Sequence, residues 1–249
     1  LIAANVDTAF IVCSMNEDFN PSRIERYLAL AQAADAEPVV VLTKADLTDE
    51  PESWRDNVRR IDKQLQVITV NALENSSMDA LSDWLKPGNT VVMLGSSGVG
   101  KSTLTNTLLG EFRQSTQGIR VDDAKGRHTT TGRSLFPLPQ GGLILDTPGM
   151  RELQLADCHD GIVSAFADIQ LLAEACRFAD CQHDQEPGCA VQAAVEQGSL
   201  DSRRLSNYQK LLREDALNSA SLAQKRAKDK AFTRFVNFSQ KESRKFKGR

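Results

Sequence analysis

The sequence predicts an α/β protein in which a mainly parallel sheet is covered by helices and followed by a small, mainly α-helical, metal-binding C-terminal domain. Three observations carry this prediction. Strand-like apolar segments alternate with helical segments up to about residue 155. A glycine-rich phosphate-loop motif, GSSGVGKST, stands between a strand and a helix in the middle of this alternation. Three cysteines and a histidine cluster between residues 176 and 189.

The alternation starts with TAFIVCSM (8–15), whose apolar run ends in polar residues as a buried parallel strand does. In NPSRIERYLALAQAA (20–34), Asn20 is a suitable N-cap, Pro21 suits the first helical position, and apolar residues recur on one face. Further strands are predicted within 38–46, 66–72 and 89–95, and further helices at 54–65, 76–85 and 101–110. Two adjacent strands within 133–139 and 141–149 complete a first domain of residues 1–155, and residues 156–249 form the second.

Size and charge narrow the class of protein. No apolar run of the 249 residues approaches the roughly 18 that suggest a membrane span. The five cysteines, three of them clustered with a histidine, suit metal binding in a reducing compartment, so we expect a cytoplasmic protein. The net charge of −3 hides a basic tail, because residues 224–249 hold ten Lys/Arg and two acids. No feature indicates an oligomer, so we expect a monomer that does not associate with membranes.

The phosphate-loop motif predicts a nucleotide site. Gly95 and Gly100 allow the backbone N–H groups to surround a phosphate, Lys101 is suited to the β- and γ-phosphates, and the Ser102 hydroxyl to Mg²⁺. The residues expected to contact nucleotide are Ser97, Gly98, Val99, Gly100, Lys101, Ser102 and Thr103. The loop alone does not separate GTP from ATP, or a hydrolase from a kinase.

Thr43-Lys44-Ala45-Asp46 favours guanine. The Asp46 carboxylate can accept from both the ring N–H and the exocyclic amine of guanine, and the stem of Lys44 can lie along the base. Asn71 and Ala72, after the next strand, complete the base site. Taken alone, TKAD equally fits a helix start with a solvated lysine.

Two further segments contain residues suited to contact Mg²⁺ and the γ-phosphate. In DTPG, Asp146 can hold Mg²⁺ through water and the Gly149 N–H can meet the γ-phosphate; in GRHTTTGRS, Thr130 can complete the Mg²⁺ shell. A simple turn and a polar loop would give the same residues. The base-reading motifs precede the phosphate loop, whereas GTPases ordinarily have the reverse order, so the motifs predict a circularly permuted GTPase. DTPG then leads directly into the C-terminal domain, and a switch there could reorient that domain on hydrolysis.

The spacing C-x4-C-x-H-x5-C brings Cys176, Cys181, His183 and Cys189 together as a closed tetrahedral site for one structural Zn²⁺. Unligated or redox-active cysteines are the alternative, and Cys13 and Cys158 are expected to be simple core or surface residues. The basic tail interleaves phenylalanines with cations, which suits RNA binding as well as it suits a solvated helix packed on the metal-binding domain.

This combination of permuted motifs and Cys₃His spacing resembles the RsgA (YjeQ) family of ribosome small-subunit-dependent GTPases from Leu1 to about residue 215. The resemblance implies Mg²⁺-dependent binding of GTP and GDP, hydrolysis stimulated by the small ribosomal subunit, a role in its late maturation, and contacts with its rRNA. Members of the family also carry an N-terminal OB-fold that would precede Leu1, so we expect this chain to be either a piece of a longer protein or a shortened form of it.

Three positions refine the expected mechanism. Thr43 replaces the usual Asn of the guanine motif, which removes an amide that would help to fix the loop and the base. Met150 follows DTPG where Ras-like enzymes have the glutamine that orients water, so intrinsic hydrolysis should be slow. By resemblance, His128 is the candidate to position that water, and a surface histidine without this role is the alternative. The alternatives are an ATP-dependent kinase, against which TKAD argues, and a GTP-gated RNA-binding module with negligible turnover.

Overall fold

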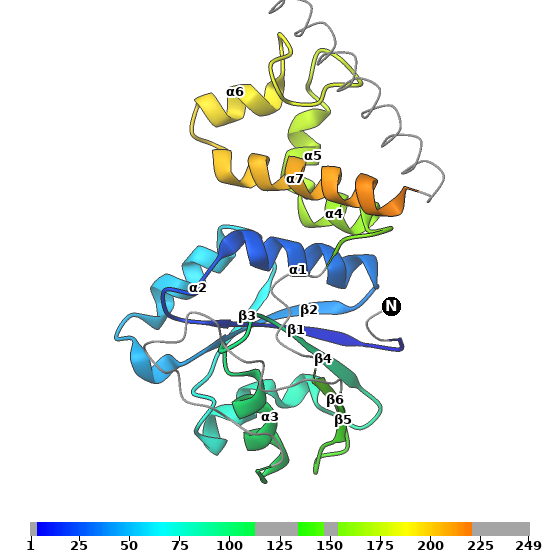
Figure 1. The fold of residues 1–249 in the computed structure, drawn as a ribbon. Helices are drawn as coiled ribbons and strands as arrows, with labels where there is room; N and C mark the ends of the chain where they lie inside the picture. The colour runs from blue at the N-terminus through cyan, green and yellow to red at the C-terminus, as the bar shows by residue number, and fades with distance from the viewer. Residues whose placement is uncertain (1–3, 113–133, 147–153, 221–249) are drawn as a thin grey trace, which may run out of the picture.

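A computed structural model describes residues 4–112, 134–146 and 154–220. Its centre is a six-stranded sheet with the order β3-β2-β1-β4-β6-β5 (Figure 1). The strands are β1 (Thr8–Ser14), β2 (Glu37–Thr43), β3 (Gln66–Thr69), β4 (Thr90–Leu94), β5 (Ser134–Pro137) and β6 (Leu143–Asp146). Four neighbouring pairs are parallel, and only the edge pair β5/β6 is antiparallel. The predicted mixed α/β sheet is confirmed.

Helices cover both faces of the sheet. On one face lie α1 (Pro21–Ala33) and α2 (Pro51–Arg59), and on the other lie the 3₁₀ segment η2 (Asn75–Trp84) and α3 (Lys101–Leu109) (Figure 1). A second 3₁₀ segment, η1 (Ala45–Leu47), follows β2. Alternate residues of β1 serve the two cores: Ile11 and Cys13 face α1, and Phe10 and Val12 face α3 and η2. The strands are apolar on both faces for this reason.

Two of the predicted helices differ in the structure. Residues 54–65 were expected to be helical throughout, but α2 ends at Arg59 because the Asp62 carboxylate accepts from the Gln64 N–H and holds a turn there. The segment 76–85 forms the 3₁₀ segment η2 and not an α-helix. The helix predicted from Asn20 starts as expected: the Asn20 side chain accepts from the Arg23 N–H and Pro21 occupies the first position.

The C-terminal region (residues 154–220) is helical and packs on α1. It contains α4 (His159–Ala165), α5 (Ala167–Ala173), α6 (Ala190–Glu196) and α7 (Ser202–Ser219). Helix α4 lies so close to α1 that a Cβ on Gly161 would be 2.2 Å from the Ala29 carbonyl oxygen. One apolar cluster runs from the sheet through α1 into this region, from Ile11 to Leu211. None of the described helices is long and apolar enough to cross a membrane.

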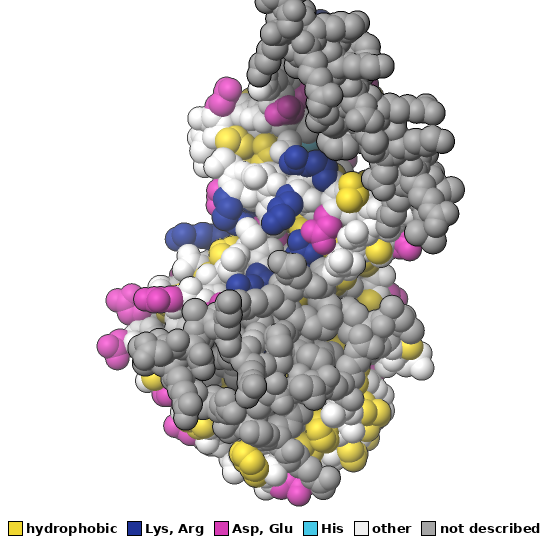
Figure 2. Space-filling model, viewed as in Figure 1, with side chains coloured by type: hydrophobic (Ala, Val, Ile, Leu, Met, Phe, Trp, Pro, Cys, Tyr) yellow, Lys and Arg dark blue, Asp and Glu magenta, His cyan; other side chains and the backbone are white. Residues whose placement is uncertain are grey.

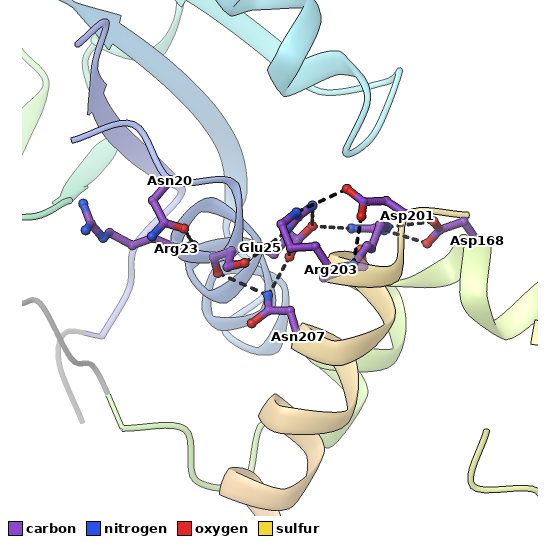
Figure 3. Close-up of polar contacts among 10 residues, drawn as sticks. Asn20, Arg23, Glu25, Asp168, Asp201, Arg203 and Asn207 are labelled. Atoms are coloured by element: carbon purple, nitrogen blue, oxygen red, sulfur yellow. Dashed lines mark hydrogen bonds and ion pairs between the residues drawn. The ribbon is translucent and has the colours of Figure 1, made fainter. Parts of the chain in front are cut away.

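A buried polar network fastens α7 to α1 (Figure 3). Glu25 on α1 is fully buried, and its carboxylate accepts from Arg203, Arg204 and Asn207 of α7. Arg204 also pairs with Asp168 at 2.6 Å. One position along α1, Arg26 makes a bidentate pair with Glu214 of α7, with both contacts at 2.6 Å. The C-terminal region is therefore held to α1 by packing and by charge.

Candidate functional site

The sequence motifs meet at one edge of the sheet. Parallel strands present their carboxyl ends on the same side, and here β2 ends at Thr43, β3 leads to Asn71, β4 leads to Gly95, and β6 ends at Asp146. In open parallel sheets, ligands bind in the crevice outside these carboxyl ends. The predicted base-reading and phosphate-binding residues therefore share one edge, although 52 positions separate Thr43 from Gly95 in the chain.

A direct hydrogen bond joins the two halves of the predicted nucleotide site. The buried Thr43 hydroxyl lies 2.6 Å from the Val99 carbonyl oxygen of the phosphate loop and 3.3 Å from the Cys13 carbonyl oxygen. A hydroxyl has one proton, so the shorter contact with Val99 is the better donor geometry. The sequence suggested that replacing Asn by Thr would leave this loop less fixed. The structure shows that the threonine hydroxyl itself contacts the loop.

Two glycines of the phosphate loop are required by its geometry. A Cβ on Gly95 would lie 2.5 Å from the Val12 carbonyl oxygen of β1, a distance that real side chains do not adopt. Gly100 has φ of 100°, in the left-handed region that favours glycine, and lies beside Thr43. Helix α3 begins at the next residue, Lys101. The loop therefore places its backbone at the N-terminus of α3, where an anion is favoured.

Lys101 is held under the loop. Its side-chain ammonium is buried and donates to the carbonyl oxygens of Gly95 and Ser96, each at 2.8 Å. Burial lowers the pKa of Lys101 to about 8, while the nearby Asp146 carboxylate acts in the opposite direction. The lysine therefore keeps most of its positive charge at neutral pH, beside a loop built for phosphate. The Asp146 side chain is also fully buried.

Two of the predicted base-reading residues, Lys44 and Asp46, lie in the loop between β2 and α2. Lys44 adopts a left-handed conformation with φ of 63°, which turns the chain into η1 and leaves Asp46 exposed. Burial lowers the pKa of Lys44, opposed by Asp18 and Asp46. On the neighbouring loop, the Ala72 carbonyl oxygen accepts from the Thr107 hydroxyl of α3 at 2.6 Å. The two base-reading segments are thus anchored to the phosphate loop and to the helix that follows it.

The described residues hold most of the predicted nucleotide site. Ser97, Gly98, Ser102 and Thr103 lie in the phosphate loop and the first turn of α3. The expected catalytic His128, the Mg²⁺ ligand Thr130 and the switch residue Gly149 lie outside the described residues. Their roles therefore stay predictions.

The Cys₃His cluster has the geometry of a tetrahedral metal site. The ligand atoms of Cys176, Cys181, His183 and Cys189 lie within 4.8 Å of one another. The Cys176 Sγ is 3.9 Å from Cys189 Sγ, and His183 Nδ1 is 3.7 and 3.5 Å from these two sulfurs. Tetrahedral ligands about 2.3 Å from Zn²⁺ are separated by roughly 3.7 Å, so the spacing fits. The ligand set favours zinc in a closed, structural site.

Neighbouring side chains hold the metal-binding loop in place. The Gln192 amide donates to the His183 carbonyl oxygen at 2.7 Å, and the Gln209 amide of α7 donates to the same oxygen at 2.9 Å. The Glu186 carboxylate accepts from the Gln182 and Asp184 N–H groups. Burial lowers the pKa of His183, although Glu186 opposes this, and neutral imidazole is the form that binds a metal. The cluster is thereby tied to α6 and α7.

Reasoning from the sequence missed one group of polar residues beside the phosphate loop. Asp18 and Arg23, from the loop and helix after β1, both contact the Ser96 hydroxyl. Their position gives a signal that could have found them, because charged residues directly after a central parallel strand lie at the ligand-binding edge.

Comparison with known proteins gives the same architecture. The family model described as RsgA GTPase matches residues 1–156. Two similar relatives are named Small ribosomal subunit biogenesis GTPase RsgA 2. The protein from Vibrio parahaemolyticus is 58% identical over 98% of this chain and 68% of its own length. The protein from Vibrio vulnificus is 58% identical over 99% of this chain and 71% of its own length.

Two solved structures are similar to this chain in fold. YjeQ from Thermotoga maritima is 28% identical with a TM-score of 0.59, over 84% of this chain and 71% of that one. YloQ, described as a circularly permuted GTPase, is 27% identical with a TM-score of 0.59, over 87% of this chain and 70% of that one. The permuted order of motifs predicted from the sequence is thus also the order of a solved fold.

Proposed function

This chain belongs to the RsgA GTPase family, and from that premise we propose that it hydrolyses GTP to GDP and phosphate on the small ribosomal subunit during its maturation. The observation that carries the proposal is the shared edge of the sheet. There, the Thr43 hydroxyl joins the guanine motif to the phosphate loop. A guanine nucleotide bound across this edge would contact both motifs at once.

We assign the guanine contacts to the loops after β2 and β3. The exposed Asp46 carboxylate would accept from the ring N–H and exocyclic amine of the base, and the Lys44 stem would lie along its plane. Asn71 and Ala72 would line the opposite edge. The bonds from Thr107 to the Ala72 carbonyl oxygen and from Asn71 to Glu74 hold this loop before any base enters. Preorganisation of this kind lowers the entropic cost of binding.

The phosphate loop would hold the β- and γ-phosphates. Its backbone N–H groups between Ser97 and Thr103 and the Lys101 ammonium supply positive charge where negative charge is concentrated. The hydroxyls of Ser102 and Thr130 are oxygen donors of the kind that Mg²⁺ prefers, and the carboxylate of Asp146 would hold the ion through water. When bound with GTP, Mg²⁺ would neutralise charge on the β- and γ-oxygens.

For hydrolysis, we propose that His128 positions the attacking water on the ribosome, and that the Gly149 N–H meets the γ-phosphate. Met150 stands where Ras-like enzymes have a glutamine, so turnover without the ribosome should be slow. This same feature favours the second candidate function, a GTP-gated RNA-binding module with negligible turnover.

We propose that the C-terminal region faces ribosomal RNA and that one Zn²⁺ is bound there as a structural ion. Figure 2 shows Lys and Arg side chains gathered over the C-terminal region on this face, with Asp and Glu side chains scattered around them and also present at the edge near α2. In α7 the cationic residues are Arg203, Arg204, Lys210 and Arg213. Lys210 and Arg213 are exposed and therefore free of the buried ion pairs. Exposed cations of this kind attract phosphates.

The test is GTP turnover by the full chain with and without purified small ribosomal subunits, with ATP as the competing nucleotide. Lys101→Ala should abolish nucleotide binding, and His128→Ala should preserve binding but lose the stimulation. Lys86→Ala is the matched control, because Lys86 pairs with Asp83 on the surface at 2.9 Å and lies outside the motifs. Nucleotide-gated binding to the subunit without stimulated turnover would favour the RNA-binding module. Preference for ATP would contradict both.

A further inference from the structure

Three side chains close a polar triangle beside the phosphate loop, here called the Asp18–Arg23–Ser96 clasp. The Arg23 Nη1 donates to the Asp18 carboxylate and to the Ser96 hydroxyl oxygen, both at 2.9 Å. The Ser96 hydroxyl in turn donates to the same Asp18 oxygen at 2.6 Å. All three contacts are within hydrogen-bond range, and Ser96 is buried. The clasp joins the phosphate loop to the first turn of α1.

The α1 side of the clasp is fixed independently of the phosphate loop. The Asn16 side chain accepts from the Ser14 hydroxyl and from the Asp18 N–H, and so holds the turn that presents Asp18. Phe19 packs edge-on against Trp54 at 5.2 Å between ring centres. Asn20 caps α1 by accepting from the Arg23 N–H. The clasp residues are therefore presented by a loop with its own hydrogen bonds, and Figure 3 shows Arg23 pointing away from α7.

On the other side, the clasp holds the first turn of the phosphate loop. Lys101 donates to the Ser96 carbonyl oxygen at 2.8 Å, while the Ser96 side chain is held by Asp18 and Arg23. The Ser96 residue is thus fixed through both its backbone and its side chain. A phosphate loop binds through backbone N–H groups, so its affinity depends on keeping those groups in place before the phosphate arrives.

Within the clasp, Arg23 also balances the negative charge of Asp18. Asp18 is a carboxylate in contact with a loop that binds polyphosphate, and it is close enough to Lys44 to act on its pKa. Left without a cation, it would repel the phosphates of a nucleotide. Arg23 balances this charge through the ion pair at 2.9 Å, with its side chain only 24% exposed. The pair therefore lets the carboxylate hold Ser96 with little repulsion of an anionic ligand.

We propose that Arg23 is a positioning residue for nucleotide binding: with Asp18 it fixes Ser96, and it cancels the carboxylate charge beside the phosphate loop. The inference rests on the proposed binding of guanine nucleotide at that loop. It does not give Arg23 contact with the nucleotide. The role acts on affinity, so KM for GTP should change more than kcat at saturating GTP.

The experiment is a titration of the full chain with a fluorescent GDP analogue in the presence of Mg²⁺. Arg23→Gln should raise Kd about tenfold, which corresponds to about 1.4 kcal/mol. The double variant Arg23→Gln/Asp18→Asn should recover most of the lost affinity, because the unbalanced charge of the Asp18 carboxylate is then removed. Arg23 Nη1 also donates to the Asp18 carbonyl oxygen at 3.3 Å, so this one nitrogen makes all three contacts. Because an ammonium can replace it, the Kd of Arg23→Lys should lie within about threefold of wild type.

Arg55→Gln is the matched control, because Arg55 makes an ion pair of 2.8 Å with Glu52 on α2 and its side chain is 30% exposed. This control should leave Kd unchanged. An unchanged Kd for Arg23→Gln, or a double variant weaker than the single one, would overturn the inference. If Arg23→Gln fails to fold, Ser96→Ala is used in its place, because it removes only the hydroxyl, and it should raise Kd about twofold to threefold. An unchanged Kd for Ser96→Ala would also overturn the inference. A folded wild type that binds no guanine nucleotide would instead contradict the proposed function.

Discussion

Replacing the buried Glu25 by glutamine should strongly destabilise the attachment of the C-terminal region to α1. The Glu25 carboxylate accepts four hydrogen bonds from Arg203, Arg204 and Asn207, two on each oxygen. Glutamine keeps one acceptor oxygen and turns an N–H donor group toward the others. Two bonds to the carboxylate are lost, each worth about 1.5–3 kcal/mol, so the expected loss is about 3–6 kcal/mol.

The assay is urea unfolding of Glu25→Gln followed by far-ultraviolet circular dichroism and by tryptophan fluorescence. Both tryptophans, Trp54 and Trp84, lie in the first 155 residues, so fluorescence reports on the sheet region alone, whereas circular dichroism reports on the helices of both regions. Glu52→Gln is the matched control, because Glu52 makes an exposed pair and should change the free energy of unfolding by less than about 1 kcal/mol. A loss below about 1 kcal/mol for Glu25→Gln would refute the reasoning.

Three further predictions follow from the structure. Gly161→Ala should destabilise the protein by about 2–4 kcal/mol in the same urea assay, because the new Cβ meets backbone atoms of Ala29 and Ala33 that cannot move aside; a neutral result would contradict the close packing of α4 on α1. Chelation should remove about one zinc per chain and expose the three cluster thiols to a thiol reagent, and Cys181→Ser should prevent metal retention; metal analysis that finds no zinc in the purified protein would contradict the site. The pKa of Lys101 is about 8 in the folded protein and about 10.5 in the unfolded chain, so the unfolded state binds more protons between pH 8 and 10.5. The free energy of unfolding should therefore rise by about 3 kcal/mol across this pH range, relative to that of Lys101→Met. Equal pH dependence in both proteins would contradict the burial of this ammonium.

The sequence predicted the nucleotide edge of the sheet because the physics of that edge is local. A buried parallel strand must end in a loop, and the residues that follow it in the sequence are the residues placed at the edge. Thr43, Gly95 and Asp146 could therefore be located from the strands before them. The Cys₃His cluster was predictable for the same reason, since its four ligands lie within fourteen residues.

Contacts between distant segments could not be predicted in this way. Glu25 reads as a polar residue on an amphipathic helix, yet it is fully buried because three residues of α7 satisfy its carboxylate. Nothing near Glu25 in the sequence indicates that partner, which lies about 180 residues away. The same holds for the bond between Arg23 and Ser96, 73 residues apart. The length of α2 was also overestimated, because the turn at Asp62 competes with the helix.

The attachment of α7 sets a bound on the hypothesis that hydrolysis reorients the C-terminal domain. Helix α1 starts beside the phosphate loop, and its body holds the C-terminal region through Glu25, Arg26 and the contact at Gly161. Separating the two surfaces would require all of these charged groups to be hydrated again and the close contact at Gly161 to open, so the attachment has a free energy that reorientation must overcome. A nucleotide can shift an equilibrium only by its differential affinity for the two states. Reorientation relative to α1 therefore requires GTP and GDP to differ in affinity for the two arrangements by at least the free energy of this attachment, unless the ribosome supplies the remainder. If the difference in affinity is smaller, the C-terminal region stays attached to α1, and the two move together as one body.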